Sequence, residues 1–154
     1  MANFCFAVMD NEHISAVQSI EQLAHSHPWK PSMIADLNGR GAFNHVLMVA
    51  GQVVGYFYAQ NIVGEVSLLN IAVAPEHQGK GYGRVLLSEF LKQCENRNAE
   101  SAWLEVRASN HAAISLYLAQ GFNEVDRRRD YYPAAQGRED AVIMSHYFLF
   151  SGEF

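Results

Sequence analysis

The sequence predicts a single α/β domain in which a mixed central sheet is flanked by helices. Segments with helical spacing alternate with strand-like segments along the whole chain, and a glycine-rich turn joins one strand to one helix. The chain has 154 residues, 49% of them apolar, which suffices for one domain over residues 1–154 with its own core. The expected order of elements is β-α-α-β-β-β-α-β-α-β-β.

The N-terminal half predicts one strand, two helices and a three-stranded block. Apolar residues recur at helical spacing from Ile14 to Leu23, with Asp10 or Asn11 available as N-cap, and Pro28 interrupts the pattern. Gly51-Gln52 between two apolar segments indicates a hairpin. The expected elements are a strand at 3–8, a helix at 11–23, a short helix at 32–37, and strands at 45–50, 53–62 and 65–73.

The C-terminal half predicts two helices and three strands. A buried stripe at Leu86, Phe90 and Cys94 marks the helix that follows Gly83. The apolar segment 101–107 is typical of a central strand. A second helix at 110–120 and a final hairpin of strands at 122–129 and 140–149, joined by a long connection, complete the expected fold.

Composition and charge exclude several classes of protein. The net charge of −5 argues against nucleic-acid binding through bulk charge and suits a basic peptide as partner. Cys5 and Cys94 form no C-x-x-C pair and are expected to stay reduced, and no zinc-ligand spacing predicts a metal site. There is no signal-peptide pattern and no apolar run of the roughly 18 residues that span a membrane. We therefore expect a cytoplasmic protein that acts as a monomer and binds neither nucleic acid nor membrane.

The strongest local signal is Gln78-Gly79-Lys80-Gly81-Tyr82-Gly83-Arg84, between a strand and a helix. Glycines let backbone N–H groups converge, and the following helix adds free N–H groups and the positive end of its dipole. Such a turn binds a phosphate or pyrophosphate, and Lys80 and Arg84 would add positive charge. The segment fits neither the G-K-[ST] phosphate loop nor the dinucleotide pattern. On these residues alone, a connecting turn without a ligand is the alternative.

Gln78-x-x-Gly81-x-Gly83 resembles the [Q/R]-x-x-G-x-[G/A] motif of the GNAT family of N-acetyltransferases, whose fold has the same order of elements. The resemblance implies acetyl-CoA as cosubstrate, with its pyrophosphate on this turn. It also implies that the preceding strand, at Ile71, Ala72 and Val73, pairs its backbone with the pantetheine arm. A backbone N–H of that strand is then the expected donor to the oxyanion.

Several separated motifs resemble one branch of the family, the ribosomal-protein alanine acetyltransferases. They are His27-Pro28-Trp29, the stretches 103–110, 110–122 and 137–141, and Tyr131-Tyr132-Pro133. This implies direct acetylation of the N-terminal alanine of a small-subunit ribosomal protein. An α-amine, with a pKa of roughly 7.7–8.0 against roughly 10.4 for lysine, also offers more neutral nucleophile near pH 7. An acetyltransferase for lysine or a small-molecule amine, and a non-catalytic acyl-CoA sensor, are the alternatives.

Glu105 is the candidate base because it interrupts an apolar strand. A buried carboxylate there costs free energy, so it is expected only where it has a catalytic role or a pairing partner. Burial there would raise the pKa of a carboxylic acid toward the working range. A structural ion pair with Arg107, two residues along on the same strand face, is the alternative. The resemblance favours the base, acting directly or through water.

Tyr117 is the candidate acid for the leaving sulfur. It lies about two helical turns after Asn110, so both side chains can face one side. The resemblance places the matching tyrosine near the sulfur, and core packing is the alternative. A phenol, with a pKa of roughly 10, is a slightly weaker acid than a cysteine-like thiol of roughly 8.5, so we expect a hydrogen bond that strengthens as charge develops. Asn110 would cap its helix, contact the cofactor, or both.

Aromatic residues are the candidates for acceptor binding. The resemblance implies that Tyr131 and Tyr132, in the last long loop, wall the acceptor channel; ordinary loop anchoring is the alternative. Trp29 would cover the same channel or fill the core. Arg127-Arg128-Arg129 is most simply a solvated strand, and the acidic pair Glu139-Asp140 is a candidate contact for a basic peptide, with a solvated loop as the alternative.

Overall fold

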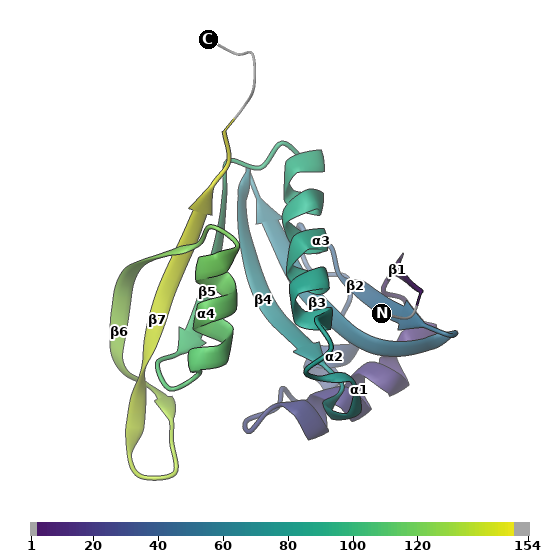
Figure 1. The fold of residues 1–154 in the computed structure, drawn as a ribbon, viewed down its shortest axis with the longest axis horizontal. Coiled ribbons are helices and arrows are strands. Elements are labelled where there is room, and N and C mark those ends of the chain that lie inside the picture. Colours follow the sequence, from purple (N-terminus) through teal and green to yellow (C-terminus); the bar gives the residue numbers. More distant parts are fainter. Residues whose placement is uncertain (1–2, 150–154) are drawn as a thin grey trace.

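In the computed structural model, which describes residues 3–149, seven strands form one sheet in the order β1-β2-β3-β4-β5-β7-β6 (Figure 1). The predicted mixed α/β fold and its order of elements are confirmed. Two short 3-10 helices, Asn11–His13 and Pro75–His77, precede α1 and α3. The elements are β1 (Phe4–Val8), α1 (Ile14–Ala24), α2 (Pro31–Ala35), β2 (His45–Val49), β3 (Gln52–Ile62), β4 (Glu65–Val73), α3 (Tyr82–Asn96), β5 (Ser101–Arg107), α4 (His111–Ala119), β6 (Asn123–Pro133) and β7 (Arg138–Tyr147).

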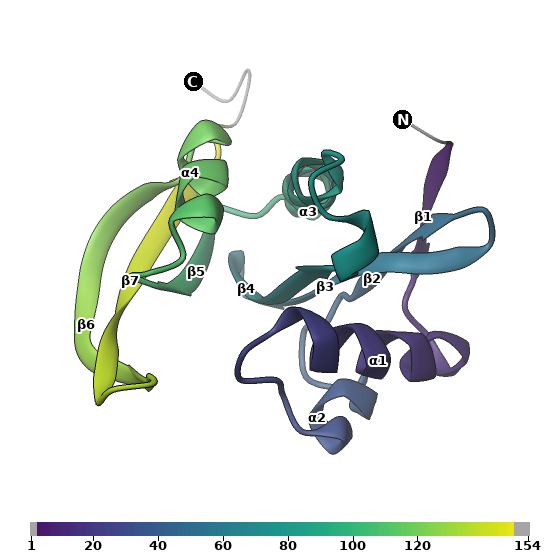
Figure 2. The ribbon, with the colours of Figure 1, turned by 60° about the horizontal axis from the view of Figure 1, so that its bottom comes forward.

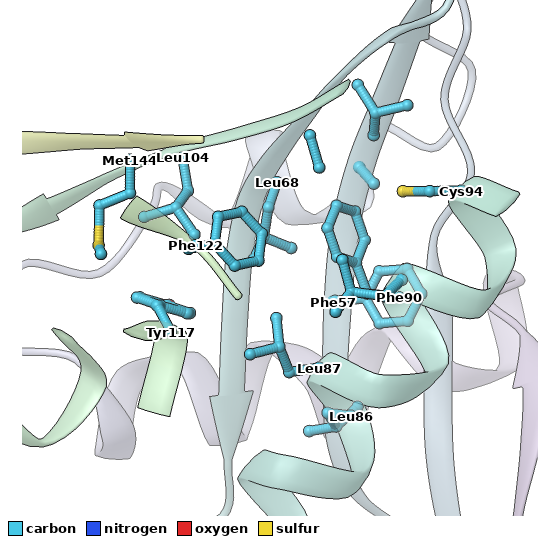
Figure 3. Close-up of a cluster of buried hydrophobic side chains, with 14 of the residues drawn as sticks. Phe57, Leu68, Leu86, Leu87, Phe90, Cys94, Leu104, Tyr117, Phe122 and Met144 are labelled. Atoms are coloured by element: carbon cyan, nitrogen blue, oxygen red, sulfur yellow. The ribbon is translucent and has the colours of Figure 1, made fainter. Parts of the chain in front are cut away.

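The helices cover opposite faces of the sheet. Figure 2 shows α3 and α4 on one side and α1 and α2 on the other. The larger apolar cluster lies under α3 and α4 and includes Phe57, Leu87 and Phe90 (Figure 3). The smaller cluster packs Val17 and Ile34 against the other face. Burial on both faces explains why the central strands read as nearly continuous apolar runs.

A β-bulge in β4 changes which side chains face which helices. Tyr58 of β3 pairs with Asn70, but its neighbour Ala59 pairs with Leu68, so Leu69 is an extra residue on β4. Before the bulge Leu68 faces the α3 cluster, and after it Ala72 faces the α1 cluster. The bulge therefore directs Asn70 toward α1.

β4 and β5 separate just before this bulge. The two strands run parallel and pair only at Glu65–Ser101, Val66–Ala102 and Ser67–Trp103. Figure 1 shows them diverging from there toward their C-terminal ends. The remaining β4 backbone pairs with β3 on one edge only, which leaves an opening in the middle of the sheet.

The predicted long connection in the final hairpin is wrong. β6 continues to Pro133 and β7 begins at Arg138, so Tyr131 and Tyr132 belong to a strand. The register moves between Arg128, opposite Ala141, and Tyr132, opposite Glu139. This bulge breaks the alternation that marks a strand in the sequence, which is why the segment resembled a loop.

Two structural features are absent from residues 3–149. No helix among them has both the length and the apolarity to cross a bilayer. Within the same residues, no cluster of three or more His, Cys, Asp or Glu side chains is arranged to hold a metal ion.

Helix α3 sits directly on Gly55 of β3. A Cβ at this position would lie 2.8 Å from Leu86 Cδ1 and 2.9 Å from the Ala72 carbonyl oxygen, which is too close without movement. We expect Gly55→Ala to lower the free energy of unfolding by about 1–3 kcal/mol, the usual cost of overpacking. Urea denaturation measures it. Gly39→Ala, where nothing lies within 4 Å, is the matched control, and equal stability of the two variants would contradict this packing.

Candidate active site

A cavity of about 620 Å³ occupies the opening between β4 and β5. One end is lined by the glycine-rich turn, including Gly79 and Gly81, and by Asn110 and Tyr117 of the α4 segment. The other end is lined by His25 at the end of α1 and by the loop that follows it. The cavity is lined by residues from elements on both faces of the sheet, His25 and Trp29 on the side of α1 and Gly81 and Tyr117 on the side of α3 and α4.

The glycine-rich turn has the backbone of an anion site. Gly79 and Gly81 adopt φ of 77° and 88°, a left-handed conformation that disfavours side chains, and Gly81 is the N-cap of α3. The first N–H groups of α3 have no partner within the helix and lie at its positive end. Gln78 donates from Nε2 to the Val73 carbonyl oxygen at 2.9 Å, which ties the turn to the end of β4.

Most of the predicted cofactor residues line this cavity. Lys80 and Arg84 belong to the turn and to the first turn of α3 but do not line the wall. On β4, the backbone of Ile71 to Val73 pairs with β3 and leaves its other edge to the cavity, as a strand-like ligand requires. The predicted cofactor residues that line the cavity are Ile71, Ala72, Val73, Gln78, Gly79, Gly81, Tyr82, Gly83 and Asn110.

Tyr117 is a buried phenol at the wall of the cavity. Its side chain is 6% exposed and meets the ring of Phe122 edge-on, with centroids 5.9 Å apart (Figure 3). Burial, with a smaller contribution from nearby Tyr132, raises the pKa of Tyr117 to about 12. Asn110 caps α4 by accepting a hydrogen bond from the Ala113 N–H at 3.2 Å.

Glu105 lies across the cavity on β5, and the expected burial of this residue is wrong. Its side chain is 36% exposed because its neighbours Leu104 and Val106 face the cluster under α3 and α4, so Glu105 faces the other side of β5. The ion pair foreseen with Arg107 is also absent among the described residues. Glu105 Oε2 lies 3.5 Å from Arg128 Nε, whereas Arg107 lies 3.7 Å from Glu139 and stacks on the Tyr132 ring.

Two of the three aromatic candidates line the cavity. Tyr132 lines the cavity, and burial and then the nearby Glu105 carboxylate raise its pKa to about 12. Tyr131 instead lines an adjoining cavity of about 340 Å³ and stacks on the Arg128 guanidinium. Trp29 lines the first cavity and packs edge-on against Tyr58, so its position is compatible with both of the roles expected for it, and contact with an acceptor stays a prediction.

The charged residues nearby are mostly paired within the chain. Glu139 accepts a hydrogen bond from the Ser109 hydroxyl at 2.8 Å, and Asp140 accepts one from the Asp130 N–H at 3.0 Å. Both also lie within 4 Å of an arginine, Arg107 for the first and Arg127 for the second. Both carboxylates are therefore already engaged by partners within the chain, rather than available to bind a basic peptide.

Sequence reasoning missed the buried residue Glu21, which also lines the cavity. The side chain is 2% exposed and accepts hydrogen bonds from the Trp29 N–H, the Tyr56 hydroxyl and Asn70 Nδ2. The available signal was its position one residue after Ile20, on the apolar face of a predicted helix, where a carboxylate needs partners.

Comparison with known proteins decides the family. The model of the acetyltransferase (GNAT) family matches residues 13–122. The chain is a member of the GNAT family. A [ribosomal protein bS18]-alanine N-acetyltransferase of Escherichia coli strain K12 is 42% identical over 137 residues, covering 89% of this chain and 93% of that protein. The Haemophilus influenzae protein of the same name is 41% identical over 129 residues, covering 83% and 88%.

A solved structure supports the same relation. The crystal structure of the ribosomal-protein-S18-alanine N-acetyltransferase from Escherichia coli superposes with a TM-score of 0.93 at 40% identity, covering 98% of this chain and 97% of that one. Membership of the GNAT family implies acetyl-CoA as cosubstrate. The free edge of β4 and the glycine-rich turn fit its pantetheine arm and pyrophosphate.

The sequence indicates Tyr117 as the donor to the leaving sulfur, a role that a phenyl ring cannot fill. We therefore expect Tyr117→Phe to lower kcat by about 10²-fold or more while preserving the contact with Phe122. With its pKa raised to about 12, the Tyr117 hydroxyl stays protonated through pH 10, so the ratio of wild-type to variant rates should stay constant from pH 7 to pH 10. Steady-state assays across this range measure it. Tyr147→Phe, on a side chain that is 63% exposed, is the control. A ratio that falls toward one near pH 10 would contradict the raised pKa.

Proposed function

We propose that this chain transfers the acetyl group of acetyl-CoA to the α-amine of the N-terminal alanine of ribosomal protein bS18. The observation that carries the proposal is the 42% identity to enzymes of that name, which extends over nearly the whole of both chains. The cavity supports it, because an acceptor and a thioester must reach one point from different directions. Distant structures of small-molecule acetyltransferases, such as one for nourseothricin at 20% identity, share the fold alone.

In the proposed mechanism, acetyl-CoA lies with its pyrophosphate on the N-terminus of α3 and its pantetheine arm along Ile71 to Val73. The acceptor enters from the side of α1, Trp29 and Tyr132. Its α-ammonium loses a proton toward Glu105, directly or through water. The neutral nitrogen then attacks the thioester carbon, and a backbone N–H of β4 donates to the developing oxyanion.

The C–S bond then breaks, and the coenzyme leaves as a thiolate that takes up a proton. Full transfer from Tyr117 is costly, because its pKa of about 12 exceeds that of a cysteine-like thiol by about 3 to 4 units, or roughly 5 kcal/mol. Tyr117 therefore acts mainly as a hydrogen-bond donor to the sulfur while charge develops. The nitrogen loses its second proton as the tetrahedral intermediate collapses to the amide, and this proton, passed through water, completes the neutral thiol, while the first proton leaves Glu105 for solvent.

The acceptor assignment is tested with three peptides of equal length and acetyl-CoA. We expect free-thiol release with a peptide that begins with alanine and carries nearby arginines, and less with a neutral peptide. The overall negative charge of the chain attracts a basic peptide, and raising the salt should shrink this advantage. Blocking the α-amine while leaving an internal lysine free should abolish turnover.

Spermidine, a reaction without acceptor, and mass mapping of the product are the controls for this assay. Equal acetylation of the blocked peptide would make the chain a lysine acetyltransferase instead. Preference for spermidine would favour a small-molecule amine. Acetyl-CoA binding without turnover on any amine would favour a non-catalytic sensor.

We expect Glu105→Gln to lower kcat/KM by about 10²-fold near pH 7 while leaving acetyl-CoA affinity unchanged. The deficit should shrink toward pH 9, because an α-amine with a pKa of roughly 7.7–8.0 is then already neutral. A pH series of initial rates measures it. Glu124→Gln, which removes a comparable ion pair with Arg127 on β6, is the matched control. A deficit of equal size at every pH would indicate that Glu105 positions the acceptor rather than its proton.

A further inference from the structure

The buried carboxylate of Glu21 anchors a chain of hydrogen bonds that ends at the cavity. Glu21 Oε1 accepts from Asn70 Nδ2 at 2.8 Å, and Asn70 Oδ1 lies 2.9 Å from His25 Nε2. The His25 ring also stands 3.6 Å from the same carboxylate oxygen, one helical turn along α1. Since His25 lines the cavity, the chain links a buried negative charge to an imidazole at its wall.

Donors and acceptors along this chain determine which ring nitrogen of His25 carries the proton. The Tyr56 hydroxyl and the Trp29 N–H also donate to the carboxylate of Glu21. An ionised carboxylate can only accept hydrogen bonds, so each of its three partners must be a donor. Asn70 must turn its NH₂ toward Glu21, which leaves its carbonyl oxygen for His25. The hydrogen on His25 therefore sits on Nε2, and in the neutral ring Nδ1 is left with a free lone pair.

The position of this imidazole suits a role in acetyl transfer. Asn70 comes directly after the β4 bulge and directly before the strand edge assigned to the pantetheine arm. His25 is 34% exposed and shares the cavity with Glu105, which lies on β5 across the opening. The carbonyl end of α1, where His25 is the C-cap, adds a partial negative charge that favours a cationic acceptor.

We propose that His25 Nδ1 is a second proton acceptor for the acceptor ammonium, a role that rests on the proposed function. The N–H bond of the ammonium breaks, an Nδ1–H bond forms, and the amine attacks with the freed electron pair. Glu21 and Asn70 stabilise the imidazolium that results, and its exposed edge returns the proton to solvent. Imidazole suits this task because it exchanges a proton near neutral pH, whereas a carboxylate is normally a much weaker base.

Several titratable groups surround the ring and shape its pH dependence. Glu21 lies on α1 itself, Tyr56 of β3 donates to the same carboxylate, and His27 follows in the loop. Glu105 and Tyr132 line the cavity from β5 and β6. Of these, Glu21 is the charged group for which a contact with His25 is observed, at 3.6 Å from Nε2.

The test compares two substitutions at one position. His25→Gln keeps an N–H that can donate to Asn70 but removes the ring base, whereas His25→Ala removes both. We expect His25→Gln to lower kcat/KM for the alanine peptide about tenfold at pH 7, a modest effect for acid–base chemistry because Glu105 remains. The loss should shrink by pH 9, and acetyl-CoA affinity should not change.

His27→Gln is the matched control, since this neighbouring ring lines the same cavity but its Nδ1 faces the Ser26 hydroxyl at 3.1 Å. Wild-type rates in His25→Gln together with a loss in His25→Ala would overturn the proposal and leave His25 as a support for Asn70. So would a loss of equal size at every pH. If the wild type does not acetylate the alanine peptide, the proposed function fails, and the same variants are compared on the amine that it does acetylate.

A second measurement does not depend on activity. Long-range ¹H–¹⁵N NMR spectra distinguish the two tautomers of a neutral histidine. We expect His25 in the Nε2–H form in the wild type. A neutral ring protonated on Nδ1 has no lone pair there and would overturn the assignment.

Discussion

The separation of β4 from β5 is the constraint on which the rest of this molecule depends. A sheet whose neighbours stayed paired would have no interior opening, and α1 and α3 would cover two unconnected faces. Three paired residues hold the strands together at one end, and the bulge at Leu69 follows at once. The β4 backbone beyond it keeps an unpaired edge, and this edge is where a ligand can replace a strand.

The bulge also distributes the chemistry between the two faces. Asn70 faces α1, where its Nδ2 donates a hydrogen bond to the carboxylate of Glu21. Ile71 faces the side of α3 and α4. The glycine-rich turn and the Tyr117 phenol therefore line the cavity from the side of α3 and α4, and the groups proposed as proton acceptors, Glu105 and His25, line it from β5 and α1. The arrangement keeps Tyr117 neutral in an apolar surrounding while Glu105 stays accessible to solvent.

Features encoded by adjacent residues could be predicted from the sequence, and features encoded by distant pairing could not. The glycine-rich turn, the cap at Asn110 and the order of the elements depend on local spacing and were predicted correctly. The pairing of Glu105 with Arg128 depends on how three strands align, and a bulge in β6 hid that register. The bonds from Glu21 to Tyr56 and Asn70 join residues 35 and 49 positions apart, so the helix alone showed only an unexplained buried charge.

A cavity lined from both faces of a sheet has a kinetic consequence for the proposed function. If acetyl-CoA and the acceptor bind from opposite faces, neither needs to leave before the other arrives, and the acyl group passes between them without forming an acetylated enzyme. The cysteines of the chain are not placed to carry the acetyl group, since neither is among the residues that line the cavity. Cys5 lies on the edge strand β1, and burial raises the pKa of the Cys94 thiol to about 12. Initial-rate lines that intersect when both concentrations are varied are the signature of such a ternary complex, and parallel lines would indicate an acetylated enzyme.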